Sequence, residues 1–159
     1  MKRVFNVECS SAGIQELKKG LDEYDKWLER KSKELCERLA MMGAMRASAN
    51  FGVIKYDGPE DHSISVEQRD GGYAVIASGS TVLFVEFGSG LIGYGHPEAH
   101  GLGPGTYPGK GHWDDPDGWY YAHGKKSHGN PPNMPMYTTV KELEQELERM
   151  VKEVFDLYQ

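Results

Sequence analysis

The sequence predicts an α+β protein. A small antiparallel β-sheet packs against a long N-terminal helix and a C-terminal helix, with a long glycine-rich loop before the last helix. Apolar residues recur every three or four positions near both ends of the chain, which is the spacing of amphipathic helices. Between these segments, short stretches alternate apolar and polar residues around glycine turns, a pattern typical of β-hairpins. The length of 159 residues fits a single domain that spans residues 1–159.

The first predicted helix covers about residues 12–47. Charged residues of both signs lie between its apolar positions. Gly20 is expected to divide it into a short helix and a long one, and residues 4–7 before it alternate like a short edge strand. Such an apolar stripe is typical of a core or a subunit contact rather than of a chemical site. Its residues are Ile14, Leu17, Leu21, Tyr24, Leu28, Leu35, Leu39 and Met42.

The residue pattern in the middle of the chain predicts β-strands. Residues 52–56 are a weak candidate, whereas residues 63–68 and 73–77 alternate with period two on either side of a glycine turn. Residues 81–87 form the most apolar stretch and are expected to be the third strand of an antiparallel meander.

A long segment, residues 88–137, separates the predicted sheet from the last helix. It is rich in glycine, proline, histidine and aromatic residues and shows neither helical nor strand periodicity. Segments of this length in compact domains are usually functional loops or become ordered on binding. Its aromatic residues favour packing against a partner over a flexible linker.

The C-terminal helix is expected to begin at a capping box formed by Thr139 and Glu142, which have the T-x-x-E spacing. We expect both helices to lie on one face of the sheet, the simplest two-layer arrangement. The apolar face of this helix consists of Leu143, Leu147, Met150, Val151, Val154 and Tyr158.

Composition excludes some classes of function. A net charge of −6 is unlike that of a dedicated nucleic-acid binder, which usually carries a basic face. Cys9 and Cys36 lack the spacing of a metal or redox motif and indicate reduced thiols. No apolar run follows the basic N-terminus, and no segment approaches the length of a membrane span. We therefore expect the protein to reside in a cytoplasm.

A metal site is the strongest chemical alternative in the sequence. His96 and His100 have H-x-x-x-H spacing, and His112 follows in the same loop. However, Pro97 and nearby glycines disfavour the helix on which this spacing would bind one ion, and the H-E-x-x-H signature is absent. No nucleophile motif is present either. We therefore expect no catalytic residue, no metal ligand and no cofactor, and keep a small metal-dependent hydrolase as the alternative from another class.

The second half of the chain resembles a family of tailed-bacteriophage morphogenesis proteins, the "gp ten-like" type, described as neck, tail-completion or minor tail components. The resemblance covers most of the chain from about Ala49 onward and depends on several motifs in the right order. Many members carry a proline-containing, threonine- and glycine-rich segment after the first helix, where this chain has residues 47–51 instead. The motifs are Val85-Glu86-Phe87-Gly88-Ser89-Gly90, His96-Pro97, Tyr107-Pro108-Gly109, Trp119-Tyr120-Tyr121 and Gly129-Asn130-Pro131-Pro132-Asn133-Met134-Pro135-Met136-Tyr137.

This resemblance implies a structural, non-enzymatic virion protein of a phage or prophage, with a fold like that of tail-tube and tail-terminator proteins. Such proteins form rings, commonly hexamers, around the channel through which the DNA passes without sequence-specific binding. The implied partners are further copies of the chain and neighbouring head-connector or tail proteins, with no membrane. The implied location is the bacterial host cytoplasm during assembly and then the neck or tail of the virion. A tail-terminator, minor capsid or minor tail role is the alternative within this class.

Ring contacts are head-to-tail, so each subunit needs two different contact surfaces. We expect the segment 88–137 to supply one of them, and the sheet edge or first helix the other. The residues predicted at the subunit or partner interface are Glu86, Phe87, Gly88, Gly90, Tyr107, Trp113, Trp119, Tyr120, Tyr121, Met134 and Met136.

Overall fold

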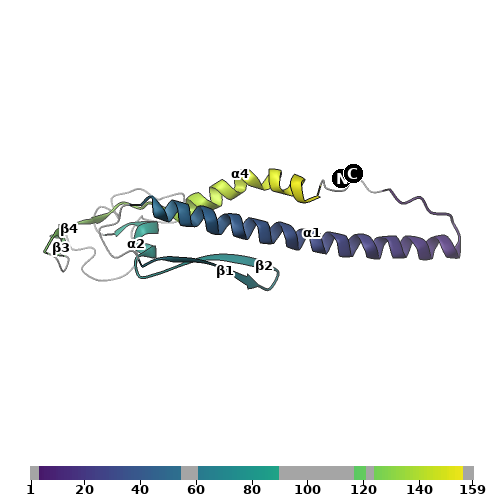
Figure 1. Cartoon of the computed structure of the whole chain (residues 1–159), viewed down its shortest axis with the longest axis horizontal. Coiled ribbons are helices and arrows are strands. Elements are labelled where there is room, and N and C mark those ends of the chain that lie inside the picture. The colour runs from purple at the N-terminus through teal and green to yellow at the C-terminus, as the bar shows by residue number, and fades with distance from the viewer. Residues whose placement is uncertain (1–3, 55–60, 90–116, 121–123, 156–159) are drawn as a thin grey trace.

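The computed structural model describes residues 4–54, 61–89, 117–120 and 124–155. The molecule is elongated, and its longest element, helix α1 (Ser11–Gly52, 42 residues), runs along the long axis (Figure 1). The predicted α+β class is confirmed: a long N-terminal helix, a two-stranded antiparallel sheet and a C-terminal helix make up the described fold.

Helix α1 begins at a side-chain cap and continues without a break. The Ser10 Oγ accepts a hydrogen bond from the Gly13 N–H at 3.1 Å, which satisfies one of the free donors of the first turn. The predicted break at Gly20 is wrong, because a glycine inside a helix costs only about 1 kcal/mol relative to alanine. Its missing side chain instead makes room for Phe5, whose ring would lie 3.0 Å from a Cβ at Gly20. The predicted strand at residues 4–7 is also wrong, since these residues form no strand.

The predicted hairpin is confirmed. Strands β1 (Ser63–Arg69) and β2 (Gly72–Ser78) pair antiparallel, with Arg69 opposite Gly72 at the turn. Gly71 has a φ of +84°, a backbone conformation that favours glycine.

The predicted third strand is wrong: residues Val82–Phe87 form a short helix, α2. An apolar run of seven residues does not by itself distinguish a buried strand from a buried helix. As a helix, the segment places Val82 and Val85 on one face, where they form a core cluster with Phe51. The weak strand at 52–56 is not formed in its described part, because Gly52 ends α1 and Val53 is its C-cap; residues 55 and 56 lie outside the described residues.

Helix α4 (Pro135–Phe155) begins four residues before the predicted capping box. Thr139 is therefore inside the helix, and its Oγ1 donates to the Pro135 carbonyl oxygen at 2.8 Å. The predicted capping box is wrong, although Pro135 at the first turn suits a helix start, where no intrahelical N–H is required.

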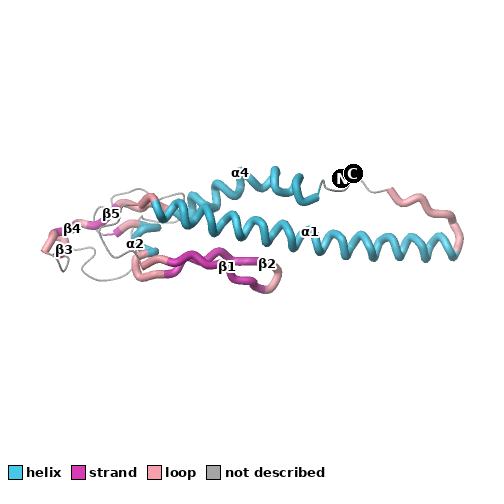
Figure 2. Tube along the Cα trace, in the orientation of Figure 1, coloured by secondary structure: helices cyan, strands magenta, loops and turns pink. Residues whose placement is uncertain are grey.

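The layers also differ from the prediction. Helix α1 lies in the middle, with the β1–β2 hairpin on one side and α4 on the other, rather than both helices covering one face (Figures 1 and 2). Gly43 permits this arrangement. A Cβ at that position would lie 3.1 Å from Val75 Cγ2 of the hairpin and 3.2 Å from Leu143 Cδ1 of α4. Three further short strands complete the described elements: β3 (Trp119–Tyr120), which pairs with β4 (Lys126–Ser127), and β5 (Gly129–Asn130).

Candidate functional site

The start of α4 is held by a buried carboxylate from α2. Glu86 is only 7% exposed, and its two carboxylate oxygens accept the N–H groups of Met136 at 2.9 Å and Tyr137 at 3.0 Å. A carboxylate at a helix N-terminus is favourable because it meets unpaired N–H donors and the positive end of the helix dipole. The backbone reinforces the contact, since the Asn133 N–H donates to the Val85 carbonyl oxygen at 2.9 Å.

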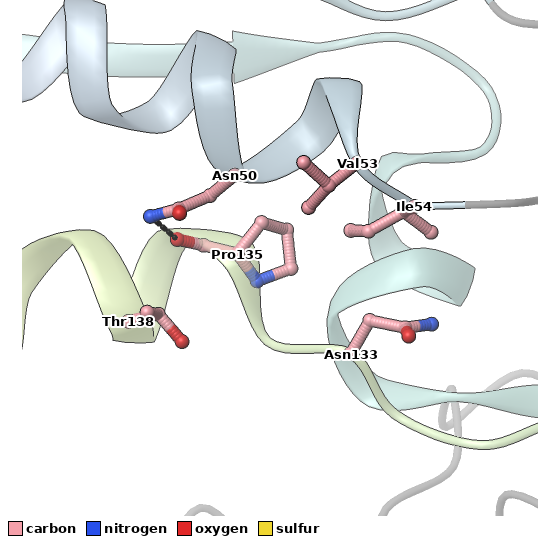
Figure 3. Close-up of a pocket in the computed structure, with 6 residues that line it drawn as sticks. All are labelled: Asn50, Val53, Ile54, Asn133, Pro135 and Thr138. Atoms are coloured by element: carbon pink, nitrogen blue, oxygen red, sulfur yellow. Dashed lines mark hydrogen bonds between the residues drawn. The ribbon is translucent and has the colours of Figure 1, made fainter.

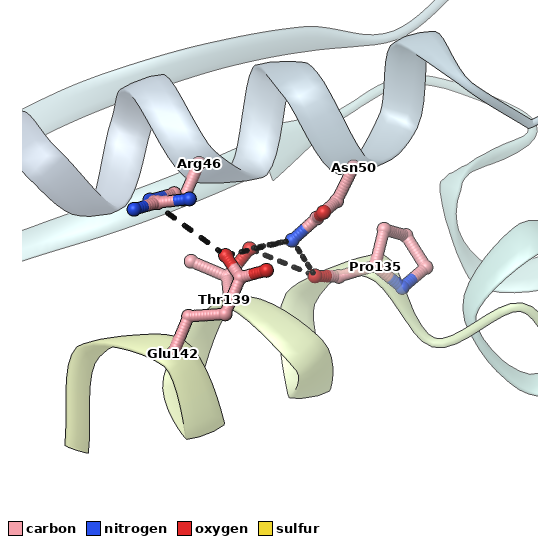
Figure 4. Close-up of polar contacts among 5 residues, drawn as sticks. All are labelled: Arg46, Asn50, Pro135, Thr139 and Glu142. Carbon is pink, nitrogen blue, oxygen red and sulfur yellow. Dashed lines mark hydrogen bonds and ion pairs between the residues drawn. The ribbon is translucent and has the colours of Figure 1, made fainter. Parts of the chain in front are cut away.

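A second polar cluster joins α4 to the end of α1 (Figure 4). The Asn50 Nδ2 donates to the Thr139 Oγ1 at 3.0 Å and lies 3.5 Å from both the Pro135 carbonyl oxygen and Glu142 Oε2. Arg46 Nε lies 3.9 Å from the same Glu142 oxygen. Because Thr139 is buried, its hydroxyl depends on these protein partners rather than on water.

An open pocket of about 500 Å³ adjoins this cluster (Figure 3). None of its described lining residues titrates near neutral pH, so these side chains supply hydrogen bonds and apolar contacts but no general acid or base. The lining residues are Asn50, Val53, Ile54, Asn133, Pro135 and Thr138.

Asp61 stabilises the turn that leads into α2. Its carboxylate accepts the hydroxyl and N–H of Ser80, the N–H at 2.9 Å, and also the hydroxyl of Thr81 at 3.0 Å. These hydrogen bonds, led by the Ser80 hydroxyl, lower the pKa of Asp61 to about 2. The carboxylate is therefore ionised at neutral pH and holds the turn that follows β2.

Most of the described residues predicted at an interface are buried or half-buried. Glu86 and Gly88 are buried, and Gly88 has a φ of +78° at the end of α2. Phe87 and Met134 are half-buried, and Met136 packs against the Phe51 cluster.

The remaining predicted interface residues divide between β3 and the part of the chain outside the described residues. Tyr120 is 69% exposed, with Lys126 Nζ 6.0 Å from its ring centroid, and Trp119 precedes it in β3. Of the predicted residues whose side chains the structure describes, Tyr120 alone is exposed. Gly90, Tyr107, Trp113 and Tyr121 lie outside the described residues.

The histidines of the metal alternative, His96, His100 and His112, also lie outside the described residues. Within the described ranges, no three histidine, cysteine, aspartate or glutamate side chains are grouped so that they could hold a metal ion.

The N-terminal part of α1 projects beyond the end of α4. Helix α4 runs antiparallel to α1 and ends beside Trp27, whose ring makes an edge contact with Phe155 at 5.8 Å. Residues 11–26, here called the α1 arm, continue beyond that point (Figure 1). The predicted apolar stripe is exposed along this arm and just after it, with 62% of Ile14, 47% of Leu21 and 39% of Leu28 accessible.

Comparison of the chain with protein-family models, with curated proteins and with solved structures gave no match in any of the three. The phage resemblance therefore stays a prediction. Among the described helices, none combines the length and the apolar character that crossing a bilayer requires, although α1 has ample length.

Proposed function

We propose that this chain is a structural assembly subunit of a tailed phage or prophage, acting in head–tail joining or tail completion as a ring of subunits. The observation that carries the proposal is the exposed apolar stripe of the α1 arm. Contiguous apolar surface of this kind usually marks a protein contact, since exposing it to water is unfavourable.

The rest of the fold supports the same proposal. The buried polar contacts of Glu86 and Asn50 tie α1, α2 and α4 into one body, while the arm extends away from that body. A rigid body with a projecting helix suits a subunit that reaches its neighbour. The motifs that resemble those of the phage morphogenesis family suggest which neighbours to expect: other copies of the chain and head-connector or tail proteins.

Ring closure requires two different surfaces on each subunit. We assign one to the segment around Tyr120, the exposed aromatic residue of β3, and the other to the edge of the β1–β2 sheet, which leaves the α1 arm for contacts between rings. A tail-terminator or minor tail role would use the same kinds of contact. It differs from head–tail joining in the protein that the ring binds, not in the fold of the subunit.

The test is genetic. Deleting the gene from the phage or prophage that encodes this chain should leave filled heads and separate tails in electron micrographs, and supplying the chain in trans should restore joined particles. A parallel complementation supplies the Leu21→Asp variant in trans. This substitution adds charge to the exposed stripe, so the variant should fail to restore joined particles. Normal joined virions from the deletion strain would refute the proposal.

A further inference from the structure

The α1 arm carries the first residues of an apolar stripe, and these residues have the spacing of a coiled coil. Ile14, Leu17, Leu21, Tyr24 and Leu28 follow one another at alternating steps of three and four residues. This spacing repeats every seven residues and forms the seam by which two helices pack side by side. In isolated globular proteins such a seam faces a core, whereas Ile14, Leu21 and Leu28 are exposed here.

One edge of this seam is already covered by the chain itself. Gly13 and Gly20 lie seven residues apart on that edge, and the N-terminal segment packs across both. A Cβ at Gly13 would lie 3.2 Å from Val7 Cγ1, and a Cβ at Gly20 would lie 3.0 Å from Phe5 Cε1. A second helix therefore has to approach from the opposite edge.

The opposite edge carries one charge of each sign. Lys18 and Asp25 lie seven residues apart there and are both exposed. No ion pair joins either of them to another described residue. An incoming helix that offered an aspartate opposite Lys18 and a lysine opposite Asp25 would match this edge, and a second copy of α1 running in the opposite direction does so.

We propose that the α1 arm pairs antiparallel with the α1 arm of a second copy of this chain, with Lys18 of each copy facing Asp25 of the other. The two-fold axis then passes between Asp22 and Glu23. In this register Leu21 of one copy packs beside Tyr24 of the other, and Leu17 beside Leu28. The contact is isologous, so the ion pair forms twice by symmetry.

Charge selects this arrangement over the alternatives. Sliding the antiparallel pair by one heptad in either direction places Lys18 against Lys18 or Asp25 against Asp25, and both are repulsive. A parallel pair would place Lys18 beside Gly13 and Asp25 beside Gly20, so it would form no ion pair and would displace the N-terminal segment from the glycines. The antiparallel register is the one that pairs both charges.

This inference does not depend on the proposed role in virion assembly. An isologous contact joins subunits two by two, whereas closing a ring requires a separate head-to-tail contact. In a ring assembly, the arm would link subunits related by a two-fold axis, between adjacent rings. Self-association through the arm and ring formation can therefore be measured and can fail separately.

The test is charge reversal followed by mixing, with the full-length chain studied by analytical ultracentrifugation. The wild-type chain should show a concentration-dependent doubling of mass, from monomer to dimer or, where a closed ring has formed, from one ring to two. Lys18→Asp alone and Asp25→Lys alone each turn two attractive pairs into two repulsive ones and should weaken self-association about tenfold. An equimolar mixture of the two single variants should recover wild-type association, because the introduced aspartate of one chain then faces the introduced lysine of the other.

Control variants on the far side of the helix separate this effect from net charge. Lys19→Asp and Glu23→Lys make the same kinds of charge change at exposed positions away from the seam and should leave association unchanged. All four variants should keep the wild-type circular dichroism spectrum. A wild-type chain that stays monomeric would overturn the inference, as would single variants that associate normally or a mixture that fails to recover.

Discussion

Replacing Glu86 tests whether a buried carboxylate, rather than the local T-x-x-E sequence, caps α4. Glu86→Ala removes two hydrogen bonds, to the N–H groups of Met136 and Tyr137 at 2.9 and 3.0 Å. A hydrogen bond to a charged group contributes about 1.5 kcal/mol or more when buried. With Glu86 only 7% exposed, water cannot replace the lost acceptor. The free energy of unfolding should therefore fall by about 3 kcal/mol.

The assay is urea denaturation followed by circular dichroism, with the melting temperature as a second measure. For a domain of this size, a loss of about 3 kcal/mol lowers the melting temperature by roughly 9 °C. Glu86→Gln keeps one carbonyl oxygen as acceptor and should lose about half as much stability as Glu86→Ala.

The matched control is Glu144→Ala, which removes an exposed carboxylate of α4 that pairs with Lys141 at 2.8 Å. An exposed pair of this kind contributes less than about 1 kcal/mol, so this variant should unfold almost like the wild type. If Glu86→Ala is no less stable than Glu144→Ala, Glu86 does not cap α4.

Asp61, the contact between Asn50 and Thr139, and the packing at Gly43 can each be tested by substitution. The pKa of Asp61 is lowered to about 2 from 3.8, so its contribution to stability is present above about pH 4 and is lost as the pH falls toward 2; Asp61→Asn should flatten the stability curve measured across that window. Asn50→Ala and Thr139→Val should show a coupling energy of about 1 kcal/mol in a double-mutant cycle from urea denaturation, and additive effects would contradict their hydrogen bond. Gly43→Leu should destabilise the fold by about 2 kcal/mol through overpacking between β2 and α4, whereas Gly52→Ala, with open space around it, should unfold at a urea concentration close to that of the wild type.

The sequence predicts correctly the elements that have either a long periodic pattern of apolar residues or a recognisable turn between neighbouring segments. The 42-residue helix shows many turns of apolar periodicity, and the hairpin has both alternation and a glycine at the turn. The segment Val82–Phe87 is too short for periodicity to separate helix from strand, and its helical form depends on burial against Phe51, which is distant in the sequence. The local pattern predicts a helix break at Gly20 because the contact between Gly20 and Phe5 is not visible in it.

The same limit applies to the candidate site. Thr139 and Glu142 have a local capping pattern, but the actual cap, Glu86, comes from 50 residues before Met136. Likewise, no neighbouring residue indicates that Asn50 meets Thr139, which is 89 residues away. The apolar stripe of α1 is recognisable from spacing alone. That its N-terminal part lies outside the core is evident only from the position of the end of α4 beside Trp27.

Native mass spectrometry of the purified full-length chain tests the central claim most directly, because it measures stoichiometry and bound metal together. The proposed ring-forming role predicts a closed oligomer without bound metal, and the family resemblance predicts that it is a hexamer. A monomer that carries one tightly held zinc ion per chain would contradict the assembly role and favour the metal-dependent alternative based on His96, His100 and His112.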